Sequence, residues 1–161
     1  MNRARLSSAL AGVIAGAWVG LAPLVASAEG TSEQPGGAML EQDYAAGLKA
    51  IEDQNWSDAI RLLSSAALRD TRNADLQNYL GFAYRNAGEL SAAFQHYNRA
   101  LSLDPRHRGA HEYIGEAYLL IGNRAKAEEH LAALKKICLL PCEEYGHLEK
   151  KVAEYSTPPA K

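Results

Sequence analysis

The sequence lacks the motifs by which many enzymes and nucleic-acid-binding proteins are recognised. No serine or cysteine sits in a nucleophile motif, and no glycine-rich phosphate loop is present. Basic residues interleaved with aromatics, which mark nucleic-acid-binding surfaces, are also missing. Without residues 1–28 the chain would carry 15 basic and 19 acidic side chains, and this net charge of −4 disfavours a phosphate-binding surface. We therefore expect no enzyme, no cofactor and no nucleic-acid partner.

Two pairs of polar residues have the spacing of a site, but each has a simpler explanation. His107 and His111 are four residues apart, a spacing that can bind a metal on one helical face. His107 falls in a predicted turn and His111 at a predicted packing position, so ordinary packing or solvent exposure is favoured. Glu112 and Glu116 have the same spacing and are interpreted as a solvated acidic face. We predict no metal site.

The first residues have the pattern of a secretory signal peptide. A basic start is followed by residues 6–28, which carry no charge and end in the small residues Ala26, Ser27 and Ala28. A retained membrane anchor is the competing interpretation, which the glycines and the proline of this segment disfavour. No cysteine lies near residue 28, so we expect no lipid anchor. We expect cleavage after Ala28, no stable membrane insertion afterwards, and a periplasmic or secreted protein with a disordered leader at 29–39.

A period of 34 residues organises the rest of the chain. Gly47, Gly81 and Gly115 are 34 residues apart, and similar residues recur around them in the same register. Such a period indicates stacked copies of one supersecondary unit. The recurring signature positions are Gly47, Ala59, Gly81, Tyr84, Ala93, Pro105, Gly115, Tyr118 and Ala127.

These residues resemble the tetratricopeptide repeat family from about Leu40 to about Leu139, with the best match in the middle copy. The resemblance implies an all-α fold, a right-handed solenoid of three helix-turn-helix units with a C-terminal capping helix. The units are predicted at 40–73, 74–107 and 108–141. Their first helices are expected at about 40–52, 74–86 and 108–121, and their second helices at about 57–69, 90–103 and 124–138.

The segment after the third unit is predicted to cap the stack. Pro141 suits the first turn of a new helix, and an apolar stripe with helical spacing follows from Tyr145 to Tyr155. Because the last apolar face of a repeat stack needs a cover with a polar outside, we predict a capping helix at 141–155. Residues 156–161 are expected to form a flexible tail.

Cys138 and Cys142 flank the junction between the last unit and the predicted cap. An uninterrupted helix would place their Cα atoms about 6.2 Å apart, near the upper end of disulfide geometry. In an oxidising compartment a structural disulfide is favoured, and so short a loop would contribute about 2 kcal/mol. A thiol redox switch, a Cu(I)-binding pair and free thiols remain alternatives, although the C-x3-C spacing is not that of thioredoxin-like proteins.

The family resemblance also implies a groove lined by the first helix of each unit. Asparagine and aromatic side chains at the groove positions suit an extended peptide, although some of these rings also serve packing between units. The carboxylate-gripping residues of some family members are replaced here by Tyr44, Leu48, Tyr79, Gly109 and Tyr113. The predicted groove residues are Tyr44, Leu48, Asn78, Tyr79, Phe82, Arg85, Glu112, Tyr113 and Glu116.

Two functions therefore follow from the sequence. The first is a non-enzymatic interaction module, an exported adaptor or scaffold that holds a peptide or helix of a partner protein in this groove. The alternative is a thiol-redox or copper-handling accessory protein that acts through Cys138 and Cys142.

Overall fold

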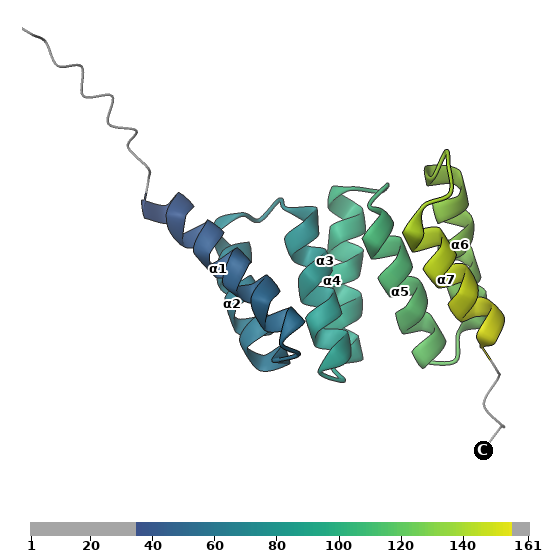
Figure 1. Cartoon of the computed structure of the whole chain (residues 1–161), viewed down its shortest axis with the longest axis horizontal. Coiled ribbons are helices and arrows are strands. Elements are labelled where there is room, and N and C mark those ends of the chain that lie inside the picture. Colours follow the sequence, from purple (N-terminus) through teal and green to yellow (C-terminus); the bar gives the residue numbers. More distant parts are fainter. Residues whose placement is uncertain (1–34, 156–161) are drawn as a thin grey trace, which may run out of the picture. The chain divides into compact units, whose positions relative to one another are not determined.

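The computed structural model describes residues 35–155, which form seven α-helices joined by short turns (Figure 1). No strand occurs within these residues. The predicted signal peptide, its cleavage point and the tail at 156–161 lie outside the described residues. None of the helices that the structure describes is long and apolar enough to cross a membrane. The helices are α1 (Pro35–Glu52), α2 (Trp56–Arg69), α3 (Ala74–Asn86), α4 (Leu90–Leu103), α5 (Arg108–Leu120), α6 (Arg124–Ile137) and α7 (Glu143–Glu154).

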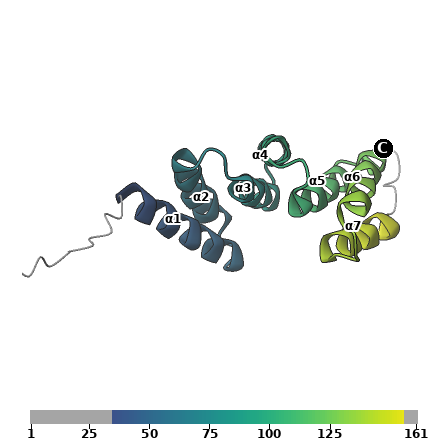
Figure 2. The ribbon, with the colours of Figure 1, turned by 90° about the horizontal axis from the view of Figure 1, so that it is seen from above.

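The helices pair as the 34-residue period predicts. Within each unit α1 packs on α2, α3 on α4 and α5 on α6, and between units α2 packs on α3 and α4 on α5. Helix α7 packs on both α5 and α6, which is how the stack is closed at this end. Seen from above, α1 and α7 lie on one side and α4 on the other (Figure 2). The predicted all-α helical repeat fold is confirmed.

Each signature glycine lies at a close approach between two helices. A Cβ atom at Gly47 would lie 2.7 Å from Leu63, and one at Gly81 would lie 2.5 Å from the ring of Tyr97. At Gly115 the nearest group is instead Leu148 of α7, at 2.6 Å. A side chain at these positions would therefore clash with a buried neighbour. The third glycine makes room for the cap and not for its own unit's second helix.

The turns inside the units share one backbone conformation. Gly88 and Gly122 have φ values of +84° and +80°, a region that favours glycine. Gln54 occupies the same register position in the first unit and also has a positive φ, +56°. The first unit therefore has the same turn geometry as the others but a residue that fits it less well.

The ends of the helices follow local capping chemistry. The side chains of Asn55, Asn73 and Asn123 accept hydrogen bonds from backbone N–H groups three residues later. Asn55 thus caps α2, which begins at Trp56. Among the connections of the described chain, the turn before α5 is capped by a ring: His107 Nδ1 accepts from the N–H of Ala110 at 3.1 Å.

Two helix starts differ by two residues or more from the sequence-based bounds. Helix α1 begins at Pro35 rather than Leu40, so residues 35–39 are helical and not part of a leader. Proline fits the first turn of a helix, where its missing N–H costs nothing. Helix α7 begins at Glu143 rather than Pro141, because Cys142 is extended (φ −117°, ψ 152°) and forms the N-cap.

Candidate peptide-binding face

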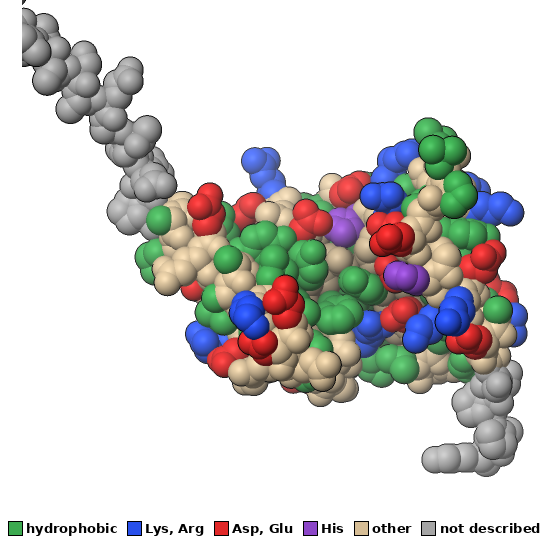
Figure 3. All heavy atoms as spheres, in the orientation of Figure 1, with side chains coloured by type: hydrophobic (Ala, Val, Ile, Leu, Met, Phe, Trp, Pro, Cys, Tyr) green, Lys and Arg blue, Asp and Glu red, His purple; other side chains and the backbone are tan. Residues whose placement is uncertain are grey.

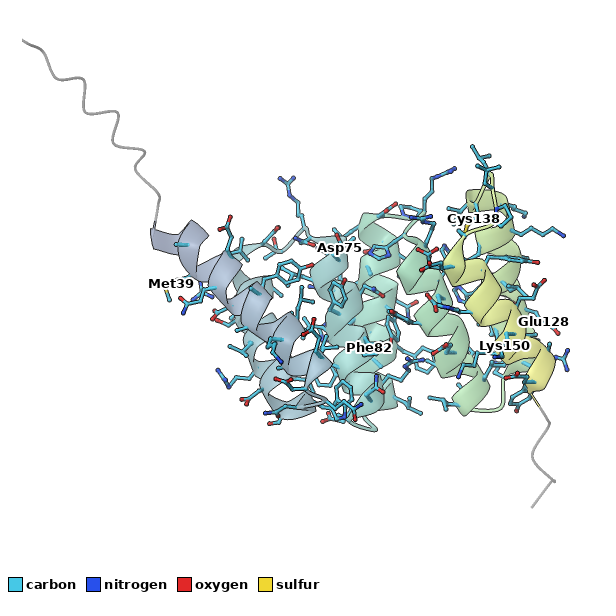
Figure 4. All side chains as sticks on the ribbon, in the orientation of Figure 1. Met39, Asp75, Phe82, Glu128, Cys138 and Lys150 are labelled. Carbon is cyan, nitrogen blue, oxygen red and sulfur yellow. A yellow bond between two sulfur atoms is a disulfide. The ribbon has the colours of Figure 1, made fainter. Side chains whose placement is uncertain are left out.

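The predicted groove residues lie on one face of the molecule, on the first helices α1, α3 and α5. Hydrophobic side chains gather in the middle of this face, and acidic and histidine side chains gather toward α7 (Figure 3). Figure 4 shows Asp75 near the start of α3 and Phe82 further along the same helix. The face therefore has two parts, an aromatic strip and a polar pocket.

The aromatic strip consists of Tyr44, Tyr79, Phe82 and Tyr113, together with Trp56 at the start of α2. The rings of Tyr44 and Tyr79 are 6.1 Å apart, and Phe82 lies 4.9 Å from Tyr113 and 6.1 Å from Trp56. Every ring of the strip is partly exposed. Each also packs against a neighbouring unit, and burial raises the pKa of Tyr44 to about 12. Tilted and edge-on rings at these distances attract one another, which helps to hold each ring in place.

Arg85 and Glu116 form an ion pair behind the strip, between α3 and α5. Both side chains are largely buried, and the Arg85 guanidinium also lies over the rings of Phe82 at 5.3 Å and Tyr113 at 5.5 Å. The sequence placed both residues in the groove as ligand contacts. Because each already has a partner, their contribution is to hold the rings in place through charge pairing and cation–π contact.

Asn78 and Glu112 occupy equivalent positions on α3 and α5 and are buried, with 4% and 6% of their surface exposed. Glu112 Oε1 accepts a hydrogen bond from His147 Nδ1 at 3.1 Å. Burial raises the pKa of Glu112, and the bond to His147 opposes that rise. Asn78 Oδ1 has no hydrogen-bond partner among the described residues. The remaining predicted residue, Leu48, is half-buried on α1.

Helix α7 contributes to this face, which the sequence analysis did not foresee. The 34-residue period runs from Tyr79 through Tyr113 to His147, and α7 therefore takes the place of the first helix of a further unit. Its first turn carries Glu143 and Glu144. A signal was present in the sequence, because the spacing alone assigns His147 to the same face as the two tyrosines.

The first turns of α3, α5 and α7 enclose a pocket of about 310 Å³. It is bounded on one side by Tyr79 and Tyr113 of the strip. The other lining residues are polar or glycine: Asp75, Asn78, His107, Gly109, Glu112, Glu143, Glu144 and His147.

Cys138 and Cys142 form a disulfide, with Cα atoms 6.0 Å apart. It links the end of α6 to the start of α7, so the cap is covalently held to the third unit. The intervening Leu139 and Leu140 are 93% and 80% exposed. Of the alternatives considered for the two cysteines, the structure therefore contains the disulfide. Among the described residues no group of three or more histidine, cysteine or acidic side chains is placed to hold a metal ion.

His107 and His111, which have the spacing of a metal site, bond to different partners. His107 caps α5, and its Nε2–H donates to Asp75 Oδ1 at 3.0 Å. His111 lies at the packing position predicted for it and bonds instead to His130 of α6, with the two Nδ1 atoms 3.0 Å apart.

Comparisons with known proteins agree with this architecture. The family model described as "Tetratricopeptide repeat" matches residues 74–107, the second unit. A comparison with curated proteins gave no match. Among solved structures, the chain is similar to the Arabidopsis OM64 TPR domain, with a TM-score of 0.66 and 16% identity, over 75% of this chain and 99% of that one.

Two similar structures are complexes with peptides. The Yersinia enterocolitica type III secretion chaperone SycD, in complex with a peptide of the translocator YopD, has a TM-score of 0.64 and 19% identity. The alignment covers 73% of this chain and 89% of that one. The second TPR domain of human RPAP3, in complex with an HSP70 peptide, has a TM-score of 0.65 and 16% identity, over 74% and 98% of the two chains.

At these identities the likeness concerns the fold, and the match at residues 74–107 concerns the sequence itself. The remaining units carry the same period in a less regular form, and the structure places them in the same helix-pair arrangement. The chain therefore contains a tetratricopeptide repeat at residues 74–107, and its seven described helices have the tetratricopeptide repeat fold.

Proposed function

We propose that this protein is a non-enzymatic interaction module that binds a peptide or helix of a partner protein on the face formed by α1, α3, α5 and α7. The observation that supports it most is the strip of partly exposed rings, which is fixed from behind by Arg85 and Glu116. Rigid aromatic side chains provide contact area at a low cost in conformational entropy. The peptide complexes of SycD and RPAP3 give this proposal a precedent in the same fold.

The test is capture of partners by the full chain and by a strip variant, Tyr79→Ala with Phe82→Ala. We expect the variant to lose capture while its far-ultraviolet circular dichroism stays that of the parent, because both rings are partly exposed. The matched control is Glu128→Gln with Glu129→Gln on the exposed face of α6, which should capture as the parent does. Capture that is unchanged in the strip variant would contradict the proposal.

We further propose that the protein acts after export, as the pattern of residues 1–28 indicates. Determining the N-terminal residue of the protein purified from its host tests this directly. A mature chain that begins at Glu29 is expected. A chain that keeps residue 1 and fractionates with membranes would favour the anchor.

The thiol alternative can be separated by counting thiols. If Cys138 and Cys142 form a stable structural bond, the protein released from the host should show no free thiol under native or denaturing conditions, and no copper. A reduced pair, or bound copper, would favour the redox or copper-handling function.

A further inference from the structure

The pocket at the first turns of α3, α5 and α7 is acidic. Four carboxylates line it: Asp75, Glu112, Glu143 and Glu144. None of the lining residues that the structure describes is a lysine or an arginine. Two histidines also line it, and each is hydrogen-bonded to one of the carboxylates.

The surrounding charges do not cancel these carboxylates. Arg108, just outside the pocket, lies 3.5 Å from Glu144 and pairs with it from the solvent side. The N-termini of the three helices contribute about half a positive charge each. Against four carboxylates, one arginine and three half charges leave the pocket negative. Acidic residues in a first helical turn are ordinary in themselves, so the charge alone identifies no ligand.

Asn78 provides the second, independent observation. Its side chain lines the pocket, is 4% exposed, and has an Oδ1 atom without a hydrogen-bond partner among the described residues. Leaving a buried amide oxygen unpaired costs on the order of 1–3 kcal/mol. The position opposite it is Gly109, where a Cβ atom would lie 3.1 Å from Asn78 Nδ2. The oxygen itself is covered, and no lining residue that the structure describes is a cation, so a donor from outside reaches this oxygen when the amide turns toward the pocket.

The walls and the size of the pocket select the kind of donor. Tyr79 and Tyr113 line the pocket. Aromatic rings are favourable neighbours for the methylene stem or the cationic head of a basic side chain. A volume of about 310 Å³ lies at the lower end of the range for ligand sites, roughly 300–1,000 Å³, and suits a single side chain. A bare metal ion would gain nothing from the rings.

We propose that this pocket binds a lysine or arginine side chain of the partner segment that the aromatic strip holds. The basic head pairs with the carboxylates and donates to Asn78 Oδ1, and its stem lies against Tyr79 and Tyr113. This inference rests on the proposed function and specifies its partner: a segment with a basic residue beside apolar ones. It is the opposite of a groove that grips a carboxylate.

The experiment is selection of random dodecapeptides displayed on phage against the immobilised full chain. A selected peptide is then synthesised with a fluorescent label, and its affinity is measured by anisotropy, alongside a version whose basic residue is replaced by norleucine. We expect the selected peptides to share a lysine or arginine at a fixed distance from an aromatic or aliphatic residue. Norleucine should weaken binding by about tenfold or more, as expected for loss of a desolvated charge pair.

The protein variant Asp75→Asn with Glu143→Gln removes two charges at exposed positions and keeps their hydrogen-bonding shape. It should weaken the basic peptide by about tenfold and leave the norleucine peptide nearly unchanged, because the lost interaction is the one that norleucine already lacks. Glu128→Gln with Glu129→Gln removes the same number of charges from α6 and should affect neither peptide.

Three results would overturn the inference. Peptides without a common basic residue that still depend on Tyr79 and Phe82 would refute the basic pocket and leave the aromatic strip as the binding surface. Failure to select any peptide, or binding that ignores the strip variant, would refute both proposals. Calorimetric binding of zinc or calcium chloride alone that disappears in Asp75→Asn with Glu143→Gln would make the pocket a metal site.

Discussion

The second and third units use the same three positions for one interhelical contact, but with different chemistry. In the second unit Tyr84 stacks on His96, with ring centroids 5.2 Å apart, and His96 Nδ1 bonds to Gln77 Oε1 at 2.9 Å. The third unit has Tyr118 stacked on His130 at 5.7 Å, and His111 stands where the second has Gln77.

The exchange of glutamine for histidine creates a pair of neutral rings. His111 Nε2–H donates to the carbonyl oxygen of Pro105 at 3.1 Å, so a neutral His111 must accept from His130 at Nδ1. Burial lowers the pKa of His111, and burial together with His111 lowers that of His130 to about 4. Burial also lowers the pKa of His96. One repeat geometry therefore accepts either an amide or a second histidine ring at this position. Only the histidine adds a second group whose protonation at low pH destabilises the unit.

The largest expected effect comes from overpacking the buried alanine of the second helix in both units. Ala93 and Ala127 are equivalent and fully buried. Changing either to leucine should lower the free energy of unfolding by about 1–3 kcal/mol, because the core has no room for the added methylenes. Urea denaturation of each variant measures this. A loss within experimental error at Ala93 would show that the register of the second unit is misassigned.

The second prediction addresses the disulfide, a feature that the third unit has and the second lacks. Cys138→Ser with Cys142→Ser should lower stability by about 2 kcal/mol, the chain-entropy value for so short a loop. Faster hydrogen exchange should be confined to α7, because only non-covalent contacts, chiefly those of Leu148 and Val152, would then hold it. Exchange that rises equally in α3 would contradict a local clip.

Acid should separate the two units at the histidine pair. Because the pKa values of His111 and His130 are lowered in the folded state, the unfolded chain binds more protons below pH 6.5, and stability falls as the pH drops from about 6.5 toward 4. The variant His111→Gln copies the second unit and should make this fall shallower. Thermal melts of both proteins across this range test it. Identical pH profiles would contradict this prediction, because they would mean that the pKa of His111 is the same in the folded and the unfolded chain.

The smallest expected effect extends the comparison to the first unit. Gln54 holds the positive φ that Gly88 and Gly122 hold in the other two. Gln54→Gly should raise the free energy of unfolding by up to about 1 kcal/mol, since relief of the left-handed strain exceeds the added freedom of the unfolded chain. Chemical denaturation gives the sign, and a destabilised variant would indicate that the glutamine makes a compensating contact.

The helix pairs could be predicted from the sequence because the 34-residue period repeats at positions that steric fit constrains most, such as Gly81 and Ala93. The bounds of α3 and α4 were predicted to the residue for this reason. The start of α7 was not, because Cys142 is extended and bonded to Cys138 at the end of α6, a constraint that helix propensities do not contain.

The candidate site was only partly predictable. Periodicity assigns Tyr79, Phe82 and Tyr113 to the face, and the structure places the ring of Phe82 against Tyr113 and that of Tyr79 against Tyr44. Periodicity does not tell which polar residues pair with one another. Arg85 and Glu116 were therefore predicted as contacts for a ligand, whereas they form an ion pair with each other. The pocket also depends on α7, whose role in the sequence analysis was limited to covering the stack.

The position of α7 has a consequence for the length of the molecule. Since Tyr79, Tyr113 and His147 continue one period, the junction at His107–Arg108 is where another complete 34-residue module would fit without changing the phase of the cap or separating Cys138 from Cys142. Because each unit of such a stack contacts only its neighbours, an inserted copy of residues 74–107 should be accommodated there. The chain is then modular in an engineering sense, with a recognition surface whose reach is set by how many modules precede its terminal helix.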